Sequence, residues 1–262
     1  MSAWLLLALA MTSSCALVLA GVVIWQRGRE RRAGPEEQPE DASQTPDVIE
    51  YLIMMIGVVY AIVLGLAIAG VWEARDGATE WVRLEAQALH EVHERVEAYP
   101  DPVRDRVRSD VDAYVAYTVG TEWPRMNAQG ELTERGDALF HRVRTGVAAF
   151  EPGTTLESHA YPGLVDQVAA ADEARTARGQ SAGSTMPGVV WFGLIAGALV
   201  VVGMVFALQI GRTARELLLA GLFSALIAFL LFLIWHFDAP YARGVADATE
   251  PFTTLLPQAF PR

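Results

Sequence analysis

The sequence predicts an all-α integral membrane protein with four transmembrane helices and an extracytoplasmic helical domain that extends from the second of them. Three observations support this fold class. Apolar residues make up 52% of the 262 residues, several apolar segments are long enough to cross a bilayer, and no segment of useful length alternates with the period of two that marks a strand. This balance is typical of a membrane protein with a modest soluble part rather than of a soluble enzyme.

The longest predicted helix runs from Ile49 to Glu97, and the other segments are expected to pack against it. Asp47 and Glu50 have the spacing of a capping box at its start. Residues 51–71 carry no charge, and a segment of this length is enough to cross a bilayer core. After this segment, apolar residues recur at helical spacing among charged ones. A helix of this length extends about 70 Å, so it should leave the membrane as a stalk that ends before Pro100.

The chain is predicted to divide into membrane and soluble segments. In chain order these are a first transmembrane helix (1–26), a cytoplasmic disordered linker (27–47), the second transmembrane helix (48–72), the extracytoplasmic helical domain (73–187), the third transmembrane helix (188–210), a cytoplasmic turn (211–216), the fourth transmembrane helix (217–237) and an extracytoplasmic tail (238–262). Several arginines follow the first apolar segment, and two others lie in the turn between the third and fourth transmembrane helices. Positive residues favour the cytoplasmic side of a membrane. We therefore expect a multi-pass protein of the plasma membrane with its amino terminus outside.

Within the extracytoplasmic domain, prolines and glycines mark the expected helix ends. One helix should begin at Asp101 and close within residues 120–124, and another should cover Thr133 to Phe150. A further helical run towards Arg178 is expected to be interrupted at Pro162 and Gly163. Gly211 and a capping box at 213–216 should separate the last two spans.

Composition and motif content narrow the function classes. The formal net charge of −11 disfavours nucleic acid as a partner, and the single cysteine, Cys15, allows no disulfide within one chain. No catalytic triad, phosphate loop or cysteine cluster can be assembled, so we predict no catalytic residue and no cofactor. His90 and His93 lie one helical turn apart, but not at zinc-protease spacing. A solvated helix face is the favoured interpretation and a metal site the alternative, so no metal is predicted.

Small residues recur every four positions in the second predicted span, at Gly57, Ala61, Gly65 and Ala69. Such a stripe lets helices approach closely in lipid, which is the favoured interpretation; a pore lining or hinge is the alternative. No Asp, Glu, Arg or His lies at depth in the predicted spans, and Tyr60 is the one phenol there. This argues against an active transporter but agrees with a channel gated by an apolar constriction.

A charge contact is predicted between the stalk and the last helix of the outer domain. Glu85 lies on the stalk, and Arg175 and Arg178 lie where that helix should pack back along it. Charge-assisted hydrogen bonds between them would fix the domain to the membrane helix. The alternative is that all three side chains are solvated.

Several pieces of the sequence resemble a bacterial membrane family known as bestrophin-like, from about residue 50 onward. The resemblance rests on Gly57–Gly65 with Val71-Trp72 and Glu85-Ala86, on Glu122-Trp123-Pro124, on Ala174-Arg175 with Arg178 ahead of Pro187, and on Phe237–Tyr241 with Gly244 and Glu250-Pro251-Phe252. The tail departs from the usual pattern, with Ala239 where arginine is commoner. The resemblance implies kinship with bestrophin anion channels, which are oligomers with an apolar neck. The second span offers Ile, Val, Leu and Ala there rather than phenylalanines.

From these observations we predict a passive membrane protein of the channel type that acts as a homo-oligomer in the lipid bilayer, with anions as the candidate ions. The alternative is a non-conducting membrane sensor or interaction protein, whose outer domain binds an envelope protein. The negative outer domain counts mildly against anion entry. No enzyme activity is expected.

Overall fold

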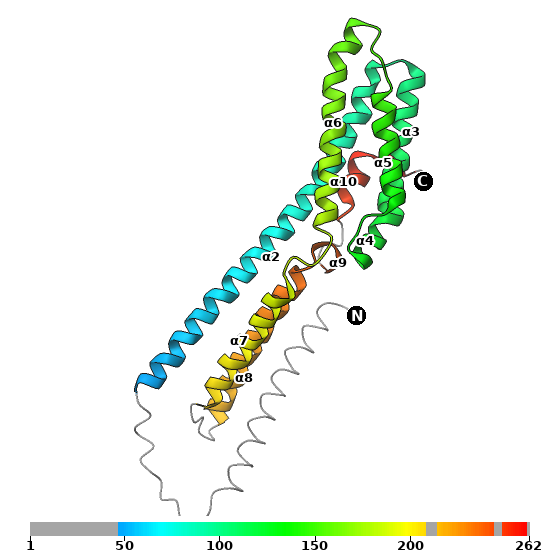
Figure 1. Ribbon diagram of the computed structural model, residues 1–262. Helices are drawn as coiled ribbons and strands as arrows, with labels where there is room; N and C mark the ends of the chain where they lie inside the picture. Colours follow the sequence, from blue (N-terminus) through cyan, green and yellow to red (C-terminus); the bar gives the residue numbers. More distant parts are fainter. Residues whose placement is uncertain (1–46, 208–213, 244–247, 261–262) are drawn as a thin grey trace, which may run out of the picture. The chain divides into compact units, whose positions relative to one another are not determined.

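The computed structural model describes residues 47–207, 214–243 and 248–260, and every regular element in these ranges is helical (Figure 1). The predicted all-α class is therefore confirmed. The chain forms two compact units. We call residues 1–71 and 186–235 the membrane unit, and residues 72–185 and 236–262 the helical domain. The helix α2, Asp47–Arg95, contributes residues to both.

The described part of the membrane unit contains helices suited to a bilayer. The first part of α2, helix α7 (Gly188–Ala207) and helix α8 (Ala214–Phe237) are the three described helices long and apolar enough to span it. The Tyr60 hydroxyl of α2 donates a hydrogen bond to the Leu194 carbonyl of α7 at 2.8 Å. A Cβ at Gly197 would lie 2.6 Å from the Tyr60 ring, so glycine is required for this approach. The predicted first span, the linker, Cys15 and Gly211 lie outside the described residues.

The helical domain is a bundle built on the second part of α2. After the 3-10 turn Val96–Ala98 come α3 (Asp101–Tyr117), a π-helical turn (Thr118–Glu122), α4 (Trp123–Gln129), α5 (Glu134–Ala148) and α6 (Thr155–Gln180). The core is formed by the apolar faces of these helices, which supply fully buried residues such as Val82, Leu89, Val111, Val143 and Ala171.

Side-chain caps mark the starts of α5 and α6. The Thr133 hydroxyl accepts a hydrogen bond from the Gly136 backbone N–H at the start of α5. Thr154 and Glu157 form a reciprocal capping box at the start of α6, which satisfies backbone donors that lack a helical partner. Gly130 ends α4 in the left-handed conformation, with φ of 75°.

Two predicted interruptions are wrong. The helix expected to break at Pro162 and Gly163 is continuous across both, as α6. A proline inside a helix costs about 3 kcal/mol, but the capping box precedes this one and buried Leu164 and Val168 follow it, so packing outweighs the lost hydrogen bond. The break expected at 120–124 is instead the π-helical turn, and helical backbone continues to Gln129 because Pro124 occupies the first turn of α4, where no hydrogen bond is lost.

The predicted tail is part of the domain core. It forms α9 (Pro240–Arg243), α10 (Glu250–Leu255, red in Figure 1) and a 3-10 turn, Pro257–Ala259. Phe252 and Leu256 are fully buried, and the Tyr241 hydroxyl donates to the Ala78 carbonyl of α2 at 2.7 Å. The Tyr241 ring also meets Trp123 edge-on, with ring centroids 5.2 Å apart.

Candidate functional site

A cluster of charged side chains lies in the core of the helical domain. Its two carboxylates, two guanidiniums and one tyrosine come from α2, α3, the π-helical turn and α6. Each side chain is at most 3% exposed. We call this group the buried ion network; it comprises Glu85, Tyr114, Glu122, Arg175 and Arg178.

One end of the network joins α2 to α6. The Arg178 guanidinium donates from Nε to Glu85 Oε2 at 2.6 Å and from Nη2 to Glu85 Oε1 at 3.3 Å. The Tyr114 hydroxyl of α3 donates a short hydrogen bond to the same Oε1. Three helices therefore meet on one carboxylate, and charge-assisted bonds of this two-pronged kind are the stronger ones in proteins.

The other end is centred on Glu122. Arg175 holds both of its oxygens, from Nη1 at 2.7 Å and from Nη2 at 3.0 Å. Arg178 Nη2 also donates to Glu122 Oε1, at 3.1 Å. Thr133 adds its backbone N–H at 3.1 Å and its hydroxyl at 2.8 Å, both to Oε2. The residue that caps α5 thus also tethers that helix to the network.

Arg175 extends the network towards solvent. Its Nη1 donates to the Tyr114 hydroxyl at 2.8 Å, and its Nη2 donates to Asp137 Oδ1 on α5 at 2.8 Å. Because the Asp137 side chain is 65% exposed while that of Arg175 is 3% exposed, this pair connects the domain core with its surface.

The network needs a glycine beside it. A Cβ at Gly136 of α5 would collide with the Glu122 carboxylate and lie 2.7 Å from Arg175 Nη2. The carboxylate cannot withdraw, because it is held from several sides. Only glycine allows α5 to come this close.

Electrostatics favour the ionised form of Glu122 and the protonated forms of Tyr114, Arg175 and Arg178. Burial by itself would raise the pKa of the Glu122 carboxyl, but the hydrogen bond from Arg175 and the charges of Arg175 and Arg178 outweigh it and lower the pKa to about 2. Burial and the Glu85 charge raise the pKa of Tyr114 well above its ordinary value, so its hydroxyl stays a donor. Burial opposes charge on both arginines, but the pKa of each is raised by the carboxylates.

This chemistry serves to hold helices together. Two negative and two positive charges balance, and removing one partner of a buried pair is strongly destabilising. The carboxylates already accept hydrogen bonds from guanidiniums, which leaves them poorly suited to bind a cofactor. Among the described residues, no group of three or more His, Cys, Asp or Glu side chains could hold a metal ion.

The structure brings the three residues of the predicted charge contact into one network, but with different partners. Glu85 pairs directly with Arg178. Arg175 instead pairs with Glu122, and it reaches Glu85 only through the Tyr114 hydroxyl. The sequence analysis missed Tyr114 and Glu122 as partners. In the sequence, Glu122 stood out only through the family resemblance, and no motif marked Tyr114.

The predicted small-residue stripe of α2 lies on a face that other described residues do not cover. Ala61, Gly65 and Ala69 are exposed, and no neighbouring heavy atom lies within 4 Å of a Cβ built at Gly57 or Gly65. On an adjacent part of the helix surface, Tyr60, Leu64 and Val71 are buried, and Tyr60 makes the hydrogen bond to α7.

The two stalk histidines lie apart from the network. The Nδ1 atoms of His90 and His93 are buried and make no hydrogen bond; His93 Nδ1 lies 3.6 Å from Glu94 Oε1. The two histidines are therefore half-buried, whereas the sequence favoured a fully solvated helix face.

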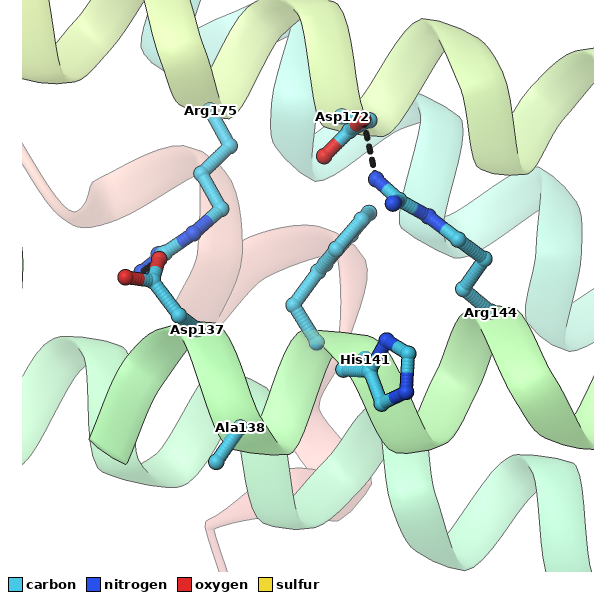
Figure 2. A pocket seen from close by; sticks show the side chains of 7 residues that line it. Asp137, Ala138, His141, Arg144, Asp172 and Arg175 are labelled. Carbon is cyan, nitrogen blue, oxygen red and sulfur yellow. Dashed lines mark hydrogen bonds and ion pairs between the residues drawn. The ribbon is translucent and has the colours of Figure 1, made fainter. Parts of the chain in front are cut away.

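A polar pocket of about 460 Å³ opens between α5 and α6, beside the network (Figure 2). It is lined by Asp137, Ala138, Phe140, His141, Arg144, Asp172 and Arg175. Arg175 belongs to both the pocket and the network. Figure 2 shows the Arg175–Asp137 pair at one end and the Arg144–Asp172 pair at the other, with His141 near Arg144.

The fold and this network define a helical membrane protein whose helical domain is held together by buried charge pairs. The chain belongs to the bestrophin-like family, because the model of the Bestrophin-like domain matches residues 12–252. Residues of the network, namely Glu85, Glu122, Arg175 and Arg178, are among those that carry the sequence resemblance to this family.

A solved structure shares the fold. The crystal structure of a membrane protein matches with a TM-score of 0.64 over 97% of this chain and 99% of that chain, at 10% sequence identity. No match was found among curated proteins. These comparisons support a membrane protein of the bestrophin-like family.

Proposed function

We propose that this chain is a passive, channel-type membrane protein that works as a homo-oligomer, with anions as the conducted species. In this proposal it crosses the plasma membrane four times, with its amino terminus and the helical domain outside. It has no enzyme activity. Lipid and further copies of the same chain are its partners, and nucleic acid is not.

The exposed small-residue stripe of α2 carries this proposal. Ala61, Gly65 and Ala69 are exposed along a helix suited to span the bilayer. Apolar area gives helices no reason to associate in lipid, whereas small residues let backbones approach closely. In an oligomer, the stripes of neighbouring copies would meet around a common axis.

The character of the spans supports a passive route. The apolar stretches of α2, α7 and α8 carry no ionisable side chain at depth, while ion-coupled transporters usually place such groups there. A pore lined by small and aliphatic side chains would be gated by dewetting.

Conductance of the purified protein in planar bilayers tests the proposal, with chloride and potassium gradients imposed. The reversal potential is expected to follow chloride. Gly65→Leu should change the unit conductance or abolish the oligomer, whereas Gly70→Leu, on another exposed part of α2, should leave both unchanged. Silence of a folded oligomer at all voltages would refute the channel proposal.

The second candidate is a non-conducting sensor or an interaction protein with an envelope protein partner. The pocket of the helical domain favours it, because a concave polar site of about 460 Å³ is suited to a ligand. Crosslinking in whole cells would distinguish the two: a discrete heterologous partner together with silent bilayers supports this candidate.

A further inference from the structure

The pocket between α5 and α6 has an ion pair at each end, and the helix that supplies the cation differs between the two pairs. At one end α6 supplies the cation, Arg175, and α5 the anion, Asp137. At the other end α5 supplies the cation, Arg144, and α6 the anion, Asp172. We propose that this pocket binds a linear zwitterion such as a short peptide, with its ammonium group on Asp137 and its carboxylate on Arg144.

The two ends of the pocket differ in which member of the ion pair can bind a ligand. The Arg175 guanidinium is held by the buried Glu122 carboxylate at 2.7 and 3.0 Å, so it cannot turn towards a ligand. Asp137 is bonded to Arg175 through Oδ1 only and its side chain is 65% exposed, which leaves Oδ2 to accept from an ammonium. This end therefore selects a cation.

At the far end the cation is the group that can be freed. The side chains of Arg144 and Asp172 are 47% and 41% exposed, and exposed pairs of this kind contribute at most about 1 kcal/mol. A ligand carboxylate can displace Asp172 and bind the Arg144 fork through two oxygens. This end therefore selects an anion.

The spacing sets the size of the ligand. Asp137 and Arg144 are two turns apart on α5, about 10 Å along its axis. The charged groups of one amino acid are too close together to reach both, whereas an extended tripeptide spans about 10 Å. His141 lies near the Arg144 end of the pocket (Figure 2), where it can contact a peptide carbonyl. The volume of about 460 Å³ is within the usual range for small-molecule sites.

Calorimetric titration of the full-length protein in detergent with trialanine tests this proposal. Acetylation of the amino end and amidation of the carboxyl end should each weaken binding about tenfold or more. Asp137→Asn should weaken trialanine binding but not binding of the acetylated peptide, and Arg144→Gln should weaken trialanine binding but not binding of the amidated peptide.

Two substitutions on the same helix serve as controls. Glu134→Gln and Arg135→Gln each remove a charge of an exposed side chain outside the pocket, of the same sign as Asp137 and Arg144 respectively, and neither should change affinity. Thermal midpoints of all variants would show that they are folded. Absence of binding to the folded wild-type protein, equal binding of the doubly capped peptide, or unchanged affinity in both pocket variants would each overturn the proposal. None of these results depends on whether the protein conducts ions.

Discussion

The buried ion network predicts a strong energetic coupling between Glu85 and Arg178. Arg178 is fully buried and donates to both oxygens of Glu85, to Glu122 and to the Met126 sulfur. Arg178→Ala would leave Glu85 as a buried charge without its main partner, and Glu85→Ala would do the same to Arg178. Each single change should therefore cost about 3–5 kcal/mol of the free energy of unfolding.

The double variant should cost much less than the two single changes together, since neither charge is then left alone. We expect a coupling energy of about 2–3 kcal/mol between Glu85 and Arg178. The same cycle between Glu85 and Arg175 should give less than about 1 kcal/mol, because these side chains meet only through Tyr114.

Urea unfolding of the full-length protein in detergent is the suitable assay, since urea does not screen charges. Trp123 lies beside Arg178, with the guanidinium carbon 5.7 Å from the ring centroid. In a background with the other six tryptophans replaced by phenylalanine, its fluorescence reports on this part of the core. A Glu85–Arg178 coupling energy below about 0.5 kcal/mol, the usual scatter of additive sites, would refute the pairing.

Three further predictions follow from glycine contacts and from a carboxyl pKa. Gly136→Ala should lower the free energy of unfolding by about 2 kcal/mol or more, whereas Gly146→Ala on the same helix, where a Cβ meets only ordinary contacts at 3.7 Å, should be neutral or stabilising by up to about 1 kcal/mol; equal effects in a urea titration would contradict this. Glu122 has a folded-state pKa of about 2 against an ordinary 4.5. The free energy of unfolding of the domain should therefore fall by up to about 3 kcal/mol as the pH falls from 4.5 to 2. Glu122→Gln should flatten this part of the dependence of stability on pH. Gly197→Ala should lower the thermal midpoint by pushing α7 away from α2, while Gly193→Ala, which meets nothing within 4 Å, should not.

The helices were predictable where their own residues determine them. The apolar stretch of α2 and its amphipathic continuation follow directly from the pattern of apolar and charged residues, as does the start of α5 near Thr133. The break predicted at Pro162 was wrong because the rule for proline considers only the local backbone. Whether the residues after Pro162 are buried depends on the other helices of the bundle.

The partners in the buried network were less predictable for a geometric reason. That Glu85 and two arginines lie on opposing helices can be inferred from their positions, but which arginine meets Glu85 depends on how the helices are rotated. Glu122 enters the core through a π-helical turn, which shifts the register by one residue relative to an α-helix, and no residue pattern marked it. Gly136 resembles any helical glycine until the carboxylate beside it is seen.

The burial of α10 in the domain core has a consequence for biosynthesis. The ribosome completes α6 before it has made the two membrane helices that precede Tyr241 and Phe252, so the bundle lacks these core residues at that stage. At ~5–20 residues per second, the missing part follows roughly 4–14 s later. During this interval the side of α3 that the 3-10 turn Pro257–Ala259 covers is open to chaperones and proteases. The domain completes its core only after both later membrane helices have been synthesised.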